Sequence, residues 1–129
     1  MSAEFLVDTS VWVDVYRGGD EALTSLVGGL VKSKRVSTTG FVLAELLRGV
    51  RSEPEFRQVV EDFGALHYID AGSAVFLKAS ELSFSLRKKG RSVSLFDALI
   101  AAAALLDHQT VITRDSDFWR FPGLKVKRV

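Results

Sequence analysis

The chain has 129 residues, of which 47% are hydrophobic and 26% charged, and its formal net charge is +1 at pH 7. This length and composition predict one globular domain spanning residues 1–129, with enough apolar side chains to bury a core. The chain contains no cysteine, which excludes disulfides, thiol nucleophiles and thiolate zinc sites and is typical of a reducing compartment.

The sequence shows no segment for export or for the membrane. Residues 1–8 have neither the basic start nor the apolar stretch of a signal peptide. The longest apolar run, Leu95 to Leu106, contains Asp97 and is too short to cross a bilayer. We therefore expect a cytoplasmic protein without a membrane partner.

The predicted elements begin with a buried strand. Phe5-Leu6-Val7 is an uninterrupted apolar run that ends at Asp8, as in the central strands of parallel sheets. The acid would then stand at the carboxyl end of the strand, where open α/β sheets bind their ligands. A short helix over residues 11–16 follows, with Thr9 or Ser10 as its expected N-cap.

Glycines and an acid delimit the next helix. Gly18-Gly19 ends the first helix, and Asp20 is expected to cap a second that runs to about Lys34. The pair Gly28-Gly29 inside it either weakens this helix or marks close packing against a neighbour. Residues 36–39 then predict a short strand.

The middle of the chain predicts further helices and a strand. Residues 41–51 form a mostly apolar helix, and Pro54 suits the first turn of a helix that ends at Phe63. Residues 66–69 are strand-like, and residues 74–89 form an amphipathic helix with a basic C-terminal end.

The C-terminal part completes an alternating pattern. An almost wholly apolar helix over residues 94–106 precedes a strand at 110–113, a turn or short helix at 115–119 and an edge strand at 124–126. Strands that alternate with helices in this way predict an α/β fold with a mostly parallel central sheet.

Two basic clusters, at residues 87–91 and 125–128, stand out against the small net charge. Taken alone, such runs are ordinary solvated faces. If several of the acids converge in one pocket, however, the remaining surface is basic and would suit a polyanion.

Four carboxylates lie in apolar surroundings near a predicted strand end or helix start: Asp8, Glu45, Asp97 and Asp115, with Asp117 two residues beyond the last. Burying an isolated carboxylate costs several kcal/mol unless it is paired, protonated or bound to a metal. Four such sites suggest one shared pocket.

Each acid also has a local explanation that involves no pocket. Asp8 could cap the helix after it, and Glu45 could pair with Arg48 on a helix surface. The segment Ser94-x-x-Asp97 matches a capping box, and Asp115-x-Asp117 matches an Asx-turn. These explanations are independent of one another, whereas one common pocket accounts for all the acids.

Carboxylates gathered in one pocket cannot all stay ionised without a cation between them. Because the chain has no thiols and only two histidines, oxygen ligands predict a hard ion, Mg²⁺ or Mn²⁺. Such an ion lowers the pKa of a bound water and binds phosphate oxygens, and two ions about 4 Å apart can stabilise both oxygens of an in-line displacement. An acidic metal pocket within a basic surface suggests hydrolysis of phosphodiester bonds.

The acids fall in four motifs that resemble those of PIN-domain nucleases. In chain order the motifs are Val7-Asp8-Thr9-Ser10-Val11-Trp12, Thr39-Gly40-Phe41-Val42-Leu43-Ala44-Glu45-Leu46, Phe96-Asp97-Ala98-Leu99-Ile100-Ala101-Ala102 and Thr113-Arg114-Asp115-Ser116-Asp117-Phe118. Their order and spacing, and the length of the chain, are most similar to the VapC-like ribonuclease toxins of type II toxin–antitoxin systems.

The resemblance implies a PIN-like three-layer α/β/α sandwich with a sheet in the order 3-2-1-4-5. It also implies a Mg²⁺-dependent endoribonuclease, usually a homodimer, that acts on RNA as a toxin and is inhibited by a cognate antitoxin. A metal-activated water would attack the phosphodiester, and the products would carry a 5′-phosphate and a 3′-hydroxyl.

By the same resemblance, a catalytic quartet of acids holds the metal: Asp8, Glu45, Asp97 and Asp115. Asp8 and Asp97 are expected to bind the metal directly. Glu45 and Asp115 complete the site, bind a second ion or orient the attacking water. Asp117 matches a further metal-binding acid. Thr9, Ser10 and Thr113 match positions at which the family has small hydroxyl side chains. These hydroxyls could hold the carboxylates or waters in place.

Two other functions are compatible with parts of the pattern. A haloacid-dehalogenase-like phosphatase also has an acid after its first strand, but it needs a second acid where this chain has Ser10. A non-catalytic PIN-like binding protein would be expected to lack at least one acid of the quartet, and all four are present here.

Other conspicuous side chains have structural explanations. His67 and His108 have no partner pattern and are expected at the surface or in turns. Trp12 and Trp119 could stack on bases, but packing in the core or in a dimer is the better explanation. Arg114 could contact a phosphate or form an ion pair.

Overall fold

The structure, a computed structural model, describes residues 3–129. Its centre is a five-stranded sheet in the order β3-β2-β1-β4-β5, in which neighbouring strands are parallel. The strands are β1 (Phe5–Val7), β2 (Val36–Thr38), β3 (His67–Tyr68), β4 (Thr110–Thr113) and β5 (Lys125–Arg128). The predicted strand order is confirmed, and β5 extends two residues further than predicted.

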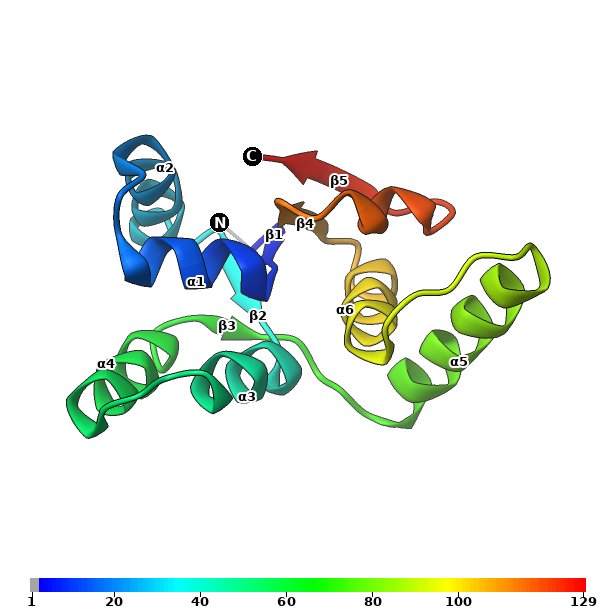
Figure 1. Cartoon of the computed structure of the whole chain (residues 1–129), viewed down its shortest axis with the longest axis horizontal. Helices are drawn as coiled ribbons and strands as arrows, with labels where there is room; N and C mark the ends of the chain where they lie inside the picture. The colour runs from blue at the N-terminus through cyan, green and yellow to red at the C-terminus, as the bar shows by residue number, and fades with distance from the viewer. Residues whose placement is uncertain (1–2) are drawn as a thin grey trace.

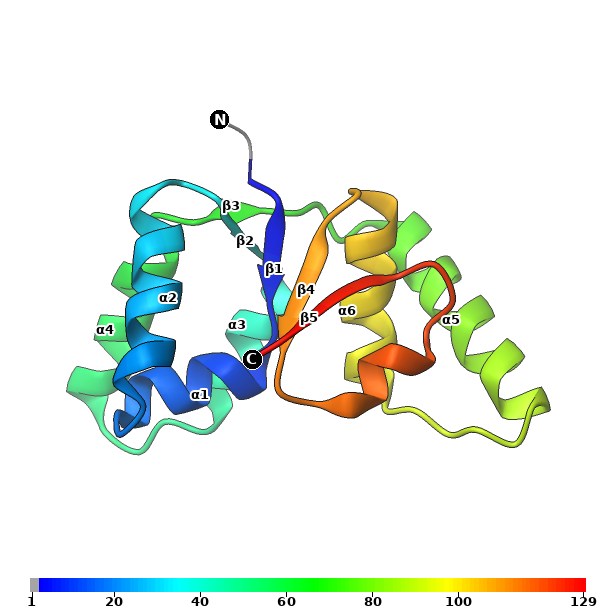
Figure 2. The ribbon, with the colours of Figure 1, turned by 90° about the horizontal axis from the view of Figure 1, so that it is seen from above.

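Helices connect the strands and cover the sheet. They are α1 (Thr9–Arg17), α2 (Glu21–Lys32), α3 (Gly40–Arg48), α4 (Glu53–Phe63), α5 (Ser73–Lys88), α6 (Leu95–Leu106) and the 3-10 helix η1 (Ser116–Arg120). Figure 1 shows their arrangement around the sheet. In the view of Figure 2, α1, α2 and α4 lie on one side of the sheet and α5 and α6 on the other, which confirms the three-layer α/β/α architecture.

The core lies around the two central strands, because both of their faces are covered. Leu6 and Val7 of β1 and Val111 and Ile112 of β4 have no exposed surface. Every residue of α6 from Ala98 to Ala104 is buried, and the short alanine side chains among them let the helix pack closely against β4 and α5. Within residues 3–129, no helix combines the length and apolar character that a bilayer span requires.

Helix α1 begins two residues earlier than predicted and has a different N-cap. Asp8 occupies the N-cap position, and its carbonyl accepts hydrogen bonds from the N–H groups of Val11 and Trp12. The predicted capping role of Thr9 or Ser10 is therefore wrong. The Asp8 side chain makes no capping hydrogen bond either. Its Oδ2 atom accepts hydrogen bonds from two hydroxyl groups instead, as described below.

Helices α2 and α3 confirm one predicted cap and differ from the sequence prediction in two places. The Asp20 carboxylate accepts a hydrogen bond from the N–H of Leu23, as predicted. A Cβ at Gly28 or Gly29 would meet nothing within 4 Å, so the prediction of close packing at these glycines is wrong. Helix α3 ends at Arg48 rather than at residue 51.

The chain direction places several functional candidates at one end of the sheet. Because the strands are parallel, their carboxyl ends share one edge. Figure 2 shows the start of α1, the start of α6 and η1 at this end of the molecule. The segments that carry Asp8, Asp97 and Asp115 are therefore neighbours, although they are far apart along the chain.

Candidate active site

Asp8 lies at the carboxyl end of β1 and is only 4% exposed. Its N–H donates to the carbonyl of Ile112 over 2.9 Å, so β4 holds its backbone. Its Oδ2 atom accepts hydrogen bonds from Ser10 Oγ at 2.8 Å and from Thr113 Oγ1 at 2.9 Å. Burial raises the pKa of the Asp8 carboxyl, and the two hydroxyls oppose this rise. Ser10 and Thr113 thus orient this carboxylate.

Asp97 projects from the first turn of α6. Ser94 caps this helix, because its hydroxyl accepts the N–H of Asp97 at 3.1 Å, so the predicted start of the helix is confirmed. Burial, together with the negative charges of Asp8 and Asp115, raises the pKa of Asp97 to about 6. The cap therefore explains the helix start, and the neighbouring acids show that Asp97 also belongs to a shared cluster.

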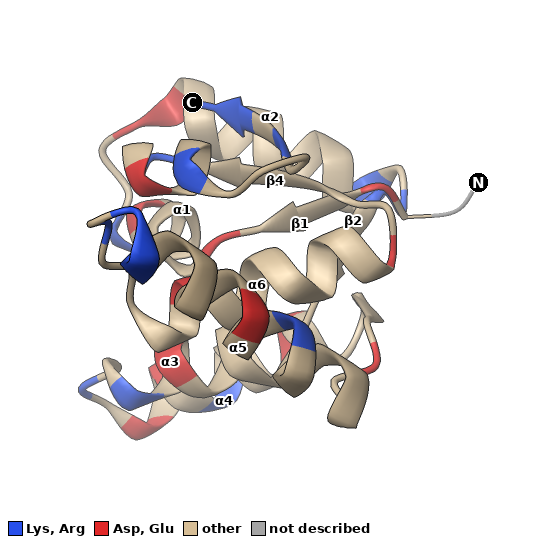
Figure 3. Ribbon diagram, turned by 90° about the vertical axis from the view of Figure 1, so that its right-hand side faces the viewer, with Lys and Arg blue, Asp and Glu red and all other residues tan. Residues whose placement is uncertain are grey.

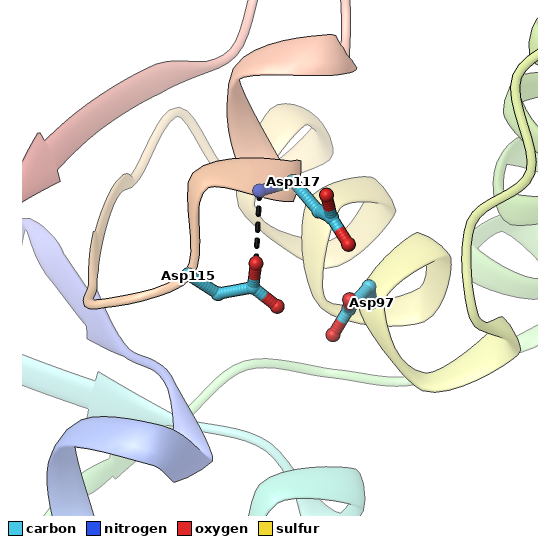
Figure 4. Close-up of side chains that lie close together, drawn as sticks. All are labelled: Asp97, Asp115 and Asp117. Carbon is cyan, nitrogen blue, oxygen red and sulfur yellow. Dashed lines mark hydrogen bonds between the residues drawn. The ribbon is translucent and has the colours of Figure 1, made fainter.

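Three carboxylates converge closely enough to share one ion. Asp97, Asp115 and Asp117 each offer an oxygen, and these oxygens lie within 4.8 Å of one another. Figure 4 shows the three side chains pointing toward a common space between α6 and η1. Asp115 also accepts the N–H of Asp117 at 2.9 Å through Oδ1, so the predicted Asx-turn is present. This turn uses one oxygen of Asp115 and leaves the other facing Asp97.

Glu45 lies on α3, at the border of this cluster. Its side chain is half-buried and lines a small cleft of about 120 Å³ with Tyr16 and Arg17. Its negative charge contributes to the raised pKa values of Asp8 and Asp97. Among residues 3–129, Glu45 forms no ion pair with Arg48, so the surface-pair explanation is wrong.

The family model of the PIN domain matches residues 5–124 of this chain. The chain belongs to the PIN domain family. It is 26% identical to Ribonuclease VapC2 of Rickettsia felis over 93% of each chain. It is 29% identical to Ribonuclease VapC19 of Mycobacterium tuberculosis, over 93% of this chain and 96% of that one.

Solved structures share the fold of this PIN domain. One chain of the crystal structure of VapBC2 from Rickettsia felis, bound to a DNA fragment from its promoter, superposes with a TM-score of 0.84 at 23% identity, covering 100% of this chain and 99% of that one. A chain of DNA-bound VapBC from Salmonella typhimurium gives a TM-score of 0.81 at 21% identity and 98% coverage of both chains. The resemblance to VapC-like proteins is thus borne out.

The acids of this PIN domain offer a donor set that fits a hard divalent cation. The converging atoms are carboxylate oxygens, without nitrogen or sulfur. In an octahedral Mg²⁺ site, adjacent ligand oxygens lie about 3.0 Å apart and opposite ones about 4.2 Å apart, and the three aspartate oxygens lie within 4.8 Å of one another. Of the two acids expected to bind the metal directly, Asp97 belongs to this trio. Asp8 lies outside it, yet near enough for its charge to raise the pKa of Asp97.

The hydroxyl positions differ in what they contact. Ser10 and Thr113 hold Asp8, and Thr113 Oγ1 also accepts the N–H of Asp115 at 2.9 Å. The buried hydroxyl of Thr9 has no hydrogen-bond partner within residues 3–129.

Arg120 is a member of the site that sequence reasoning missed. Its guanidinium lies 3.4 Å from Oδ1 of Asp117 and donates to the carbonyl of Ser92 at 3.1 Å. The arginine thereby joins η1 to the loop before α6. The spacing of Asp117 and Arg120, three residues apart in one helical turn, is the signal that could have identified the pair.

The remaining conspicuous residues have structural positions. Arg114 forms ion pairs with Asp14 and Asp20. Trp12 is buried, and its ring centroid lies 4.9 Å from that of Phe63, whereas Trp119 is 57% exposed and outside the core. Both histidines are exposed, His67 on β3 and His108 in a left-handed turn with φ of 54°, as predicted.

Proposed function

We propose that this PIN domain is a Mg²⁺-dependent endoribonuclease that acts as the toxin of a toxin–antitoxin pair. The observation that carries the proposal is the convergence of Asp97, Asp115 and Asp117 within 4.8 Å, beside the buried carboxylate of Asp8. The names of the relatives, Ribonuclease VapC2 and Ribonuclease VapC19, support RNA as the substrate.

The proposed metal ligands are Asp97, Asp115 and Asp117, with Asp8 and Glu45 completing the acidic pocket. When bound, Mg²⁺ or Mn²⁺ supplies an activated water and neutralises charge on the phosphate that is cleaved. The chain keeps Asp8 in a fixed orientation through Ser10 and Thr113. Hydrogen bonds that orient the carboxylates around a metal site raise its affinity for the ion, so Ser10 and Thr113 are expected to support the acidic pocket through Asp8.

The proposed reaction uses the acids as ligands and as proton acceptors. Glu45 is half-buried at the border of the pocket, where it would orient the attacking water and accept its proton. Hydrolysis would leave a 5′-phosphate on one product and a 3′-hydroxyl on the other.

The toxin role implies protein partners as well as a substrate. The similar folds come from VapBC complexes, which supports a cognate antitoxin as the inhibitor of this chain. We also propose a homodimer, which the exposed apolar side chains Phe76 and Leu77 of α5 favour. Substrate and antitoxin would both be encountered in the cytoplasm. Size-exclusion chromatography with light scattering tests the dimer.

Cleavage of a labelled single-stranded RNA tests the enzymatic activity directly. The purified protein should cleave RNA with Mg²⁺ or Mn²⁺, and excess EDTA should stop the reaction. Asp8→Ala and Asp97→Ala should each lower the rate by at least about a hundredfold while the circular dichroism spectrum stays unchanged. Asp107→Ala is a matched control, because Asp107 follows the other end of α6, and it should keep full activity.

Two results would contradict the proposal. One is undiminished cleavage by Asp97→Ala or in excess EDTA. The other is a wild-type protein that binds neither Mg²⁺ nor Mn²⁺ in calorimetry, which would favour a non-catalytic binding protein. Growth arrest on expression, relieved by the product of a small neighbouring open reading frame, tests the toxin role separately.

A further inference from the structure

A cleft of about 520 Å³ lies between the last turns of α5 and the loop that leads to α6. Phe84 and Arg87 of α5 line one wall, and Arg91, Ser92 and Leu95 line the other. This volume is within the range of small-ligand sites and is large enough for one nucleotide. The nuclease proposal assigns no role to these residues.

The cations around this cleft are available for binding an anion. Among residues 3–129, neither Arg87 nor Arg91 forms an ion pair with an acid, and both side chains are exposed. By contrast, Arg114 and Arg120 are already paired with aspartates. An unpaired guanidinium presents a planar set of donors that matches phosphate oxygens.

An aromatic ring accompanies these cations. Phe84 is 55% exposed, and its ring centroid lies 5.9 Å from Cζ of Arg87 and 5.3 Å from Nζ of Lys88. Cation–π contacts at an exposed site are weak, so a nucleobase could replace one of them by stacking on the ring. Cations beside an accessible aromatic ring are typical of surfaces that bind single-stranded nucleic acid.

The cleft and the acidic cluster are connected through short contacts. Leu95 lines the cleft and lies two residues before Asp97, a separation of at most about 7 Å along the chain. The carbonyl of Ser92 accepts a hydrogen bond from Arg120, which also pairs with Asp117. Figure 2 shows the α5–α6 loop at the same end of the molecule as η1, and Figure 3 shows basic segments there and along β5.

We propose that this cleft binds a single-stranded segment of the RNA next to the phosphodiester that is cleaved. Arg87 and Arg91 pair with backbone phosphates, and Phe84 stacks on a base. A duplex keeps its base faces covered, so the exposed ring selects an unpaired strand. Arg120 acts as a positioning residue, because it fixes the wall of the cleft relative to Asp117. The inference rests on the proposed nuclease function.

Binding without cleavage tests the cleft independently of activity. The probe is a fluorescein-labelled single-stranded RNA of 12 nucleotides, measured by anisotropy in EDTA at several salt concentrations. The double variant Arg87→Gln/Arg91→Gln should bind about tenfold or more weakly, and its slope of log K against log salt should be smaller by about 1.4, or 0.7 for each lost phosphate contact. Phe84→Leu should bind at least about fivefold more weakly with an unchanged slope.

A charge-matched control separates this cleft from a general loss of positive charge. Lys32→Gln/Lys34→Gln removes one cation from the last residue of α2 and one from the turn after it, at the opposite end of the strands. This variant should bind RNA within about twofold of the wild type. In the Mg²⁺-dependent cleavage assay, the cleft variants should raise KM and leave kcat nearly unchanged. Circular dichroism and light scattering verify the fold and the oligomeric state of each variant.

The outcomes distinguish this proposal from the nuclease function. Wild-type protein that cleaves RNA, together with cleft variants whose affinity, salt slope and KM equal those of the wild type, overturns the cleft and leaves the nuclease intact. A changed oligomeric state with unchanged RNA affinity also overturns it, because the face is then an interface between protein copies. Wild-type protein that binds RNA through the cleft but never cleaves it refutes the nuclease function alone.

Discussion

Thr113 Oγ1 donates a hydrogen bond to Oδ2 of Asp8 at 2.9 Å, and the two residues are 105 positions apart in the chain. The same oxygen accepts the N–H of Asp115 at 2.9 Å. One buried hydroxyl at the end of β4 therefore orients two acids from different parts of the sequence. This contact links the central strands of the sheet to the acidic pocket.

Thr113→Val should destabilise the protein and lower its activity. The substitution keeps the shape of the side chain but removes one of the two hydroxyls that hold the Asp8 carboxylate and leaves the Asp115 N–H without its partner, at a cost of about 2 kcal/mol. Urea unfolding at pH 7.5 measures the free energy of unfolding, and the cleavage assay measures the loss of activity.

Thr38→Val is a control that matches this substitution closely. Thr38 is equally buried at the end of β2, and its hydroxyl has no hydrogen-bond partner in the part of the chain that the structure describes. Removing this hydroxyl should be neutral or stabilising. Equal destabilisation by the two variants would show that Thr113 does not support Asp8.

The raised pKa of Asp97 predicts a stability that depends on pH. Its pKa is about 6 in the folded protein and 3.8 in the unfolded chain, so the folded state holds the proton more tightly. This contribution to the free energy of unfolding is present below about pH 4 and is lost as the pH rises through 6. Wild-type protein without divalent ions is therefore expected to carry a penalty at pH 7.5.

Asp97→Asn should remove this penalty. The shift corresponds to about 3 kcal/mol for complete burial, and partial exposure reduces it to about 1 kcal/mol. The variant should thus be more stable than the wild type at pH 7.5, with a Tm higher by about 4 °C, and equally stable at pH 4. A difference in stability that is the same at both pH values would argue against ionisation as its cause.

Divalent ions should reverse the same penalty. Mg²⁺ at about 100 times its Kd should stabilise the wild type by about 2.7 kcal/mol at pH 7.5. The effect should be weaker at pH 4, below the pKa of about 6 of Asp97, because protons then compete with the ion for this carboxylate. Asp115→Asn should lose most of this stabilisation, whereas Glu45→Gln, outside the closest trio, should lose less. Thermal unfolding with and without MgCl₂ measures both effects, and equal losses would place Glu45 among the ligands.

Arg114 is expected to be structural rather than catalytic. Its guanidinium is paired with Asp14 and Asp20, and about a third of the side chain is exposed, so Arg114→Gln should cost no more than about 1 kcal/mol. The kcat and KM for RNA should stay within about twofold of the wild type. A rise in KM with unchanged stability would instead assign Arg114 to phosphate binding.

Much of this molecule follows from local patterns in its sequence. Apolar runs such as Phe5–Val7 and Val111–Ile112 locate the central strands, because a strand covered on both faces needs side chains without charge. The caps at Asp20 and Ser94 are equally local, because a side chain and an N–H three residues later meet in the first turn of a helix. The strand order came from resemblance to the PIN family, since periodicity does not specify which strands pair.

The sequence also predicts that the acids gather at one edge of the sheet, because the residues that follow parallel strands all lie at the carboxyl ends of those strands. Only the tertiary structure decided which of them meet. Asp8 was expected to be free for metal while a hydroxyl capped α1, yet it occupies the cap position, and its carboxylate is held by Ser10 and by Thr113 across the sheet. The closest trio instead includes Asp117. Such contacts depend on how far β4, η1 and α6 extend past one another, and only packing sets those distances.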